Sequence, residues 1–178
     1  MADPFDELED PGVNVEREFR RDQAEAEADA FQLQRATRNM VKLAWEAMQR
    51  GDRIRVAWLG GEVSGVPVAA LGDLIVVPTE THQTGINIGS VSVLSVLDGA
   101  GGDGSVGDRT VGSFAAWTRM LEGRPIRLSL VGGETIEATL IATAADHLLV
   151  STRSGNETAV ATRAVAAVSV VGDAFLAI

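Results

Sequence analysis

The chain of 178 residues contains no cysteine and no tyrosine, and only 4% of its residues are aromatic. Without cysteine, the protein has no disulfide framework, no thiolate zinc site and no cysteine nucleophile. Because aromatic residues are scarce, valine, alanine, leucine and isoleucine must build the core that an apolar content of 46% allows.

Long apolar runs are also missing. No stretch approaches the ~18 apolar residues that a membrane-spanning helix needs. The opening MADPFDELED is acidic, whereas a secretory signal has a basic start followed by an apolar segment. We therefore expect a cytoplasmic protein without a membrane partner.

Positive charge is in short supply, since 15 Lys and Arg stand against 25 Asp and Glu. Residues 1–38 hold 11 of the acids and 5 of the bases, so much of the negative charge is concentrated there. Proteins that bind nucleic acid usually carry a basic surplus, because neutralising phosphates drives their affinity. The deficit argues against tight nonspecific binding but does not exclude a local site within residues 39–178.

The chain does contain an internal repeat. The segment AWEAMQRGDRIRVAWLGGE around Trp45 returns as AWTRMLEGRPIRLSLVGGE around Trp117, with nine positions identical at one constant spacing. Later matches slip by one residue and then by two: Asp73 with Asp146, and Ser95 with Ser169. Such self-similarity predicts two copies of one small module.

Each copy is expected to contain one helix followed by five short strands. In the first copy, apolar residues at helical spacing run up to Gly51, a residue type that often terminates helices. Strands are predicted over 54–58, 63–70, 74–79, 84–88 and 91–97. In the second copy, the helix is expected over 113–121 and the strands over 126–130, 135–142, 147–152, 158–162 and 165–171. Gly65 and Pro67 bend the second strand, which favours a small closed barrel over an open sheet.

The sequence therefore divides into four parts. Residues 1–38 are expected to form an acidic tail and an extended helix, 39–98 the first copy, 99–111 a Gly/Asp-rich linker and 112–178 the second copy. A literal GxGxxG occupies 102–107 of the linker. Because hairpin-linked strands flank it rather than a parallel βαβ unit, a flexible linker is favoured over a dinucleotide site.

A helix followed by five short bent strands resembles the Sm-like fold of the Sm, LSm and Hfq proteins. The segment 54–65, IRVAWLGGEVSG, is similar to the first two strands of that family, and the apolar runs after Asp73 and Asp146 resemble its third strand. Arg163 stands at the arginine of its final-strand motif. The resemblance implies a mainly β protein with an N-terminal helix, built of two tandem helix-plus-five-stranded Sm-like barrels that bind RNA or assemble.

Two departures from the family pattern keep a second class of function open. Apolar residues replace the asparagine that contacts the RNA base in Sm proteins, and the Lys-His signature of Hfq is absent. The alternative is a protein-interaction or transcription-associated scaffold that works through its acidic N-terminal helix. RNA binding would be favoured if the arginines converge on one face, and the scaffold if they scatter: Arg53, Arg55, Arg124, Arg127, Arg153 and Arg163.

Three arginines are the candidates for contacting nucleic acid. Arg163 comes first because of its place in the family motif, and Arg55 and Arg127 share one repeat position on the outward side of the first strand. The alternative for the latter two is that they serve solubility and form a cross-strand pair. His82 and His147 occupy non-equivalent positions without clustered partners, so we expect no metal, no cofactor and no enzymatic activity.

Sm-like barrels associate by pairing the fourth strand of one barrel with the fifth strand of the next. A tandem chain can satisfy one such pairing internally, or stack its two barrels, and either arrangement leaves two outer strands open. The strands near Thr84–Ile88 and Val165–Val171 are expected to remain open and to drive self-association, for example as a ring of three chains. Trp45 and Trp117 are expected to occupy equivalent buried places.

Overall fold

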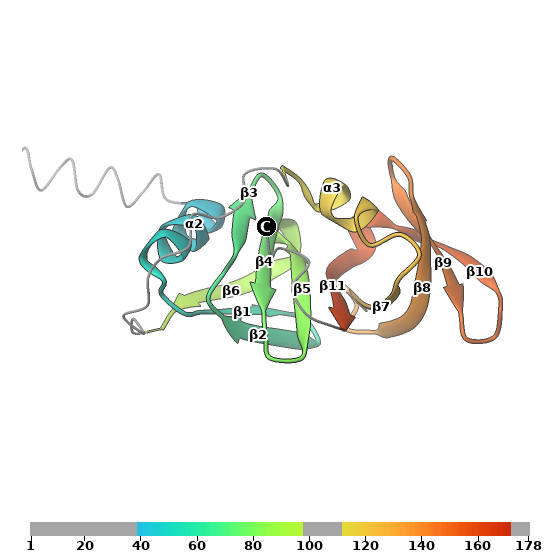
Figure 1. The fold of residues 1–178 in the computed structure, drawn as a ribbon, viewed down its shortest axis with the longest axis horizontal. Coiled ribbons are helices and arrows are strands. Elements are labelled where there is room, and N and C mark those ends of the chain that lie inside the picture. Colours follow the sequence, from blue (N-terminus) through green and yellow to red (C-terminus); the bar gives the residue numbers. More distant parts are fainter. Residues whose placement is uncertain (1–38, 98–111, 172–178) are drawn as a thin grey trace, which may run out of the picture. The chain divides into compact units, whose positions relative to one another are not determined.

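The computed structural model describes residues 39–97 and 112–171, which are mainly β-strands in antiparallel sheets (Figure 1). The acidic tail and extended helix expected at 1–38, and the linker with its GxGxxG, lie outside the described residues. Within the described ranges, no helix is long and apolar enough to cross a membrane.

Both repeats place a helix before their strands. The first contains α2 (Met40–Arg50), β1 (Ile54–Trp58), β2 (Gly61–Gly65), β3 (Ala69–Leu71), β4 (Leu74–Pro78), β5 (His82–Asn87), the 3₁₀ turn η1 (Ile88–Ser90) and β6 (Val91–Val96). The second contains α3 (Phe114–Arg119), β7 (Pro125–Leu130), β8 (Thr135–Thr143), β9 (His147–Thr152), β10 (Glu157–Ala161), η2 (Thr162–Ala164) and β11 (Val165–Val171).

Local sequence signals explain the ends of α2. The side chain of Asn39 accepts a hydrogen bond from the backbone N–H of Lys42 at 2.8 Å and caps the first turn. Gly51 ends the helix in the left-handed region, with φ of 71°, and its N–H bonds back to carbonyls of the last turn. The helix end predicted at Gly51 is confirmed.

The second strand of the first repeat is split into β2 and β3, whereas its counterpart β8 is continuous. Pro67 lies in the gap and cannot donate a hydrogen bond to a ladder. At Gly65 the chain passes close to β4, because a Cβ there would lie 2.6 Å from the carbonyl oxygen of Pro78. The bend expected at these residues is therefore a complete break.

The strands form two sheets. The smaller has the order β2-β1-β6, and the larger has the order β10-β9-β8-β7-β11-β5-β4-β3. Neither sheet closes on itself among the described strands, so the expectation of closed barrels is not met. The break between β2 and β3 interrupts the first repeat, and the larger sheet continues from one repeat into the other instead of curling back.

The junction of the repeats is an antiparallel pair of β5 and β11. Ser169 lies opposite Thr84, and their hydroxyl oxygens are 2.9 Å apart. The expectation that strands near Thr84–Ile88 and Val165–Val171 are open was wrong, because these strands pair with each other. The described strands at the sheet edges are β2 and β6 in the smaller sheet, and β10 and β3 in the larger.

The core also joins the repeats. Strand β4 is buried on both faces: Leu74 and Val76 pack with residues of the second repeat, and Ile75 and Val77 with those of the first. Burial on both faces explains why this strand is a continuous apolar run rather than an alternating one. Ala167 of β11 in turn packs into the core of the first repeat.

The two tryptophans of the repeat differ in burial. Trp117 is fully buried, whereas 40% of the Trp45 side chain is exposed, so the expectation of equivalent buried places was wrong. Helix α3 packs against β5 of the first repeat as well as β8 of its own. Its Trp117 lies directly over Gly85, where a Cβ would be 2.3 Å from the indole ring. The main strand contacts of α2 are with β3, β4 and β6 of its own repeat.

We expect Gly85→Ala to lower the free energy of unfolding by about 1–3 kcal/mol, because the methyl group overlaps the Trp117 ring and overpacking is costly. Urea denaturation would measure the change. Gly132→Ala is the matched control, since its Cβ would meet no atom within 4 Å and its φ is not positive. An equal loss in both variants would contradict the close contact.

Candidate functional site

A row of polar side chains crosses the larger sheet. Thr84, Ser169, Arg127 and Glu137 are directly opposite one another on the four adjacent strands β5, β11, β7 and β8. Arg153, just beyond the end of β9, reaches the same carboxylate. Strand pairing therefore brings residues from both repeats into one line, which local sequence cannot reveal.

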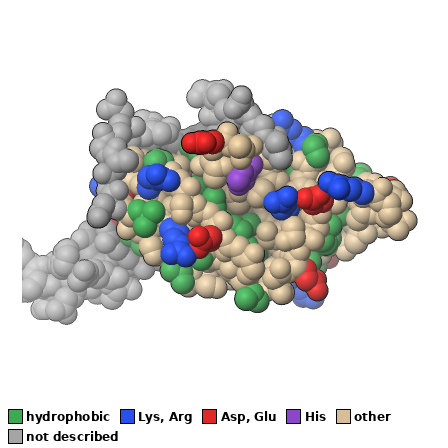
Figure 2. Space-filling view, turned by 90° about the horizontal axis from the view of Figure 1, so that it is seen from below, with side chains coloured by type: hydrophobic (Ala, Val, Ile, Leu, Met, Phe, Trp, Pro, Cys, Tyr) green, Lys and Arg blue, Asp and Glu red, His purple; other side chains and the backbone are tan. Residues whose placement is uncertain are grey.

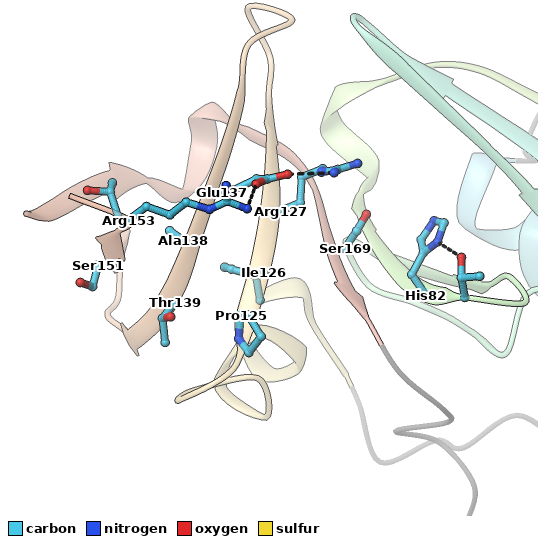
Figure 3. A pocket seen from close by; sticks show the side chains of 12 residues that line it. His82, Pro125, Ile126, Arg127, Glu137, Ala138, Thr139, Ser151, Arg153 and Ser169 are labelled. Atoms are coloured by element: carbon cyan, nitrogen blue, oxygen red, sulfur yellow. Dashed lines mark hydrogen bonds and ion pairs between the residues drawn. The ribbon is translucent and has the colours of Figure 1, made fainter. Parts of the chain in front are cut away.

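Glu137 accepts hydrogen bonds from two arginines in this row. Its Oε1 accepts from Nη2 of Arg127 at 2.9 Å, and its Oε2 accepts from Nη2 of Arg153 at 2.7 Å (Figure 3). The hydrogen bond from Arg127, followed by the charge of Arg153, holds the pKa of Glu137 below its ordinary value. Two guanidinium groups share one carboxylate, so the cluster carries one net positive charge.

A pocket of about 660 Å³ opens beside the cluster, within the size range of ligand sites. It is lined by Ser169, Arg127 and Glu137 of the polar row and by His82, Pro125, Thr139 and Ser151 (Figure 3). Both repeats contribute to it, because His82 belongs to β5 and the others to the second repeat. Such a surface can accept a ligand with hydrogen-bonding groups and negative charge.

Threonine hydroxyls orient the imidazole of His82. Its Nδ1 lies 2.9 Å from Oγ1 of Thr79 and 3.0 Å from Oγ1 of Thr81. The other histidine, His147, begins β9 of the second repeat, where its Nδ1 is 2.7 Å from Oδ1 of Asp146. That hydrogen bond lowers the pKa of Asp146. Within residues 39–97 and 112–171, neither histidine stands beside a nucleophile and a carboxylate in the order that a catalytic triad requires.

The three arginines predicted to contact nucleic acid are not brought together. Arg127 lies at the pocket, Arg55 lies on β1 in the other sheet, and Arg163 lies in η2. Arg55 donates from Nε to Glu62 at 3.0 Å, so both repeated arginines form cross-strand ion pairs. On the face shown in Figure 2, acidic side chains are interleaved with basic ones rather than leaving a continuous basic patch.

The glutamate that pairs with Arg127 was not predicted from the sequence. The repeat matches Arg55 with Arg127 and Glu62 with Glu134, so the first ion pair should return between Arg127 and Glu134. The hairpin after β7 is longer by a single position than the hairpin after β1, so Glu137 stands opposite Arg127 where Ser64 stands opposite Arg55. The sequence did contain one indication of this change, because the spacing between matching residues of the two repeats increases by one after the glycine pair.

No protein-family model matches the chain, and no curated protein is significantly similar to it in sequence. Among the residues that the structure describes, no group of three or more His, Asp or Glu side chains is placed to hold a metal ion.

The lowered pKa of Glu137 predicts a pH-dependent contribution to stability. A carboxyl group whose pKa is lowered by folding stabilises the fold at pH values above its pKa in the unfolded chain. This contribution is lost as the pH falls through the lowered pKa of the folded state. We expect Glu137→Gln to unfold at lower urea than the unmodified chain at pH 7, with a difference that shrinks below about pH 4.

Glu134→Gln is the control, because Glu134 lies in the turn of the same hairpin and no ion pair joins it to the described residues. Its urea midpoint should follow that of the unmodified chain at both pH values. If the difference for Glu137→Gln stays constant with pH, the paired carboxylate is not its source.

Proposed function

We propose that this protein is a non-enzymatic binding and assembly module of the Sm-like type, which associates with further copies of itself. The observation that carries the proposal is the β5–β11 pair. With β2 and β3 counted as one broken strand, β5 is the fourth strand of its repeat and β11 the fifth. Sm-like barrels pair these two strands between subunits.

The order of strands within each repeat gives further support. In the second repeat, the fifth strand β11 lies beside the first strand β7, followed by β8, β9 and β10 in sequence. In the first repeat, β6 likewise lies beside β1, and β1 pairs with β2. Two open Sm-like barrels joined through the larger sheet account for this order.

The strands β6 and β10 are the surfaces that we assign to self-association. They correspond to β11 and β5, and neither has a partner on its outer side among the described strands. Strand β6 has no charged residue, and its Val93 and Val96 are 51% and 37% exposed. Charged residues and proline normally protect an edge from pairing, so β6 is suited to pair with another chain.

RNA contact is the second candidate function. It is favoured by the Arg127–Glu137–Arg153 cluster, whose net positive charge borders a pocket. The pairing of the arginines with glutamates weakens it, because each ion pair must be broken or shared when a phosphate binds. An interaction scaffold that uses the acidic segment 1–38 is the alternative to RNA binding.

Self-association should be visible by light scattering, with a mass that rises above that of one chain as concentration increases. Val93→Lys places a charge on the edge of β6 and should shift the protein toward monomer by at least tenfold in concentration. Ile141→Lys is the control, because Ile141 is also exposed but lies within β8, an inner strand. A chain that remains monomeric at high concentration would overturn the assembly function.

For RNA, we expect a labelled single-stranded oligonucleotide to bind at low ionic strength, and removal of residues 1–38 to tighten binding by reducing repulsion. Arg163→Ala or Arg127→Ala should weaken binding and lower the salt slope by about one unit if the residue contacts a phosphate. If neither the full chain nor the truncated one binds at low salt, the interaction scaffold replaces RNA contact.

A further inference from the structure

The junction inside the chain provides a template for the contact between chains. Strand β11 begins at Val165 as β6 begins at Val91, and the same spacing matches β10 with β5 and the turn η2 with η1. The pair of strands that is joined in the middle of the molecule thus has two counterparts, which lie at separate sheet edges.

The hydrogen-bonded pair at the junction is repeated in the sequence. Ser169 and Thr84 lie opposite each other with hydroxyls 2.9 Å apart, and the spacing that matches these strands gives Ser95 and Thr158 as their counterparts. Both residue types are retained. Thr84 is buried, whereas Thr158 is exposed on β10. The edge strands β6 and β10 therefore carry the serine and the threonine that correspond to the hydrogen-bonded pair of the junction.

The tryptophan contact is repeated in the same way. At the junction, Trp117 packs over Gly85 of the neighbouring repeat. The counterparts are Trp45, which is 40% exposed on α2, and Ala159, which is exposed on β10. A small residue is again present at the position that corresponds to Gly85.

The fifth strand of the second repeat, β11, is more buried than its counterpart β6 in the first repeat. In β11, Ala167, Val168 and Val170 are at most 2% exposed, and β5 pairs along that strand. In β6, the counterparts of Ala167 and Val170 are Val93 and Val96, and both are exposed. A second copy seated on β6 would bury these residues as β5 buries those of β11.

We propose that copies of this chain join head to tail, with β6 of one copy antiparallel to β10 of the next, Ser95 opposite Thr158, and Trp45 seated over Ala159. This inference rests on the proposed self-association and adds its register and its anchoring residue. The interface is heterologous, because it joins two different edges of the chain. The first and last copies of an open assembly each keep one free edge, so the assembly either closes into a ring or extends as a filament.

The extra methyl group of Ala159 makes the outer contact looser than the inner one. A Cβ at Gly85 would overlap Trp117, so Trp45 cannot approach Ala159 as closely as Trp117 approaches Gly85. Ala159→Gly should therefore tighten self-association several-fold. Trp45→Ala should weaken it by about tenfold or more, since tryptophans at interface centres dominate binding.

Disulfide crosslinking tests the register directly, because the chain has no cysteine of its own. Ser95→Cys and Thr158→Cys variants, distinguished by a tag, are mixed and oxidised mildly. We expect a mixed dimer, and little dimer from either variant alone, because the interface pairs different residues. Thr84→Cys with Ser169→Cys in one chain is the positive control and should give an intrachain disulfide.

Asn156→Cys mixed with Ser95→Cys is the off-register control, since Asn156 is exposed in the turn before β10. Ile141→Ala is the control for Trp45→Ala, because both side chains are about 40% exposed and Ile141 lies away from both edges. Self-association should be unchanged in Ile141→Ala.

The outcomes separate the two proposals. If the protein self-associates but Ser95→Cys crosslinks no better to Thr158→Cys than to Asn156→Cys, this register is overturned while assembly stands. Unchanged association of Trp45→Ala would likewise overturn the anchoring role. Crosslinking of Ser95→Cys to itself would indicate a symmetric contact and overturn the head-to-tail arrangement. A strictly monomeric protein would overturn both proposals.

Discussion

The pairing of β5 with β11 is the interaction on which the described structure depends. It extends one sheet through both repeats and places β4 between two cores, where both of its faces are buried. It also creates the space in which Trp117 packs on Gly85. Without this pair, each repeat would be a module of about 60 residues that buries only a modest part of its surface.

The same pairing produces both candidate surfaces. The pocket is lined from two repeats because β5 brings His82 beside the strands that carry Arg127 and Glu137. With β5 and β11 paired inside the chain, their counterparts β10 and β6 lie at sheet edges, each with one side that no described strand covers. Ligand binding and self-association would thus share one structural origin.

The positive charges of the repeated arginines are balanced locally by glutamates and do not combine into one basic surface. The repeated arginines lie on the outer faces of their sheets, but each meets a glutamate on the neighbouring strand. Ion pairs at such exposed positions contribute little to stability. This arrangement suits a surface that recognises a particular partner better than one that follows a phosphate backbone.

Much of the local structure could be predicted from the sequence. The repeat predicted two similar modules, Gly51 predicted the end of α2, and alternating or continuous apolar residues predicted most strands, because capping and periodicity depend on near neighbours. Arg127 was predicted to face outward, and a cross-strand pair was part of one of its two expected roles.

Only the tertiary structure decided which strands pair, which edges stay open and which tryptophan is buried. Thr84 and Ser169 are distant in sequence, and Thr158 and Ser95 occupy the equivalent positions of the repeat. A single additional position in a hairpin determines that Arg127 meets Glu137 rather than Glu134. The two repeats share much of their local sequence pattern, but β5 and β11 pair with each other whereas their counterparts β10 and β6 lie at sheet edges of the described structure. The long-range packing differs between the repeats because of this pairing, which local sequence does not encode.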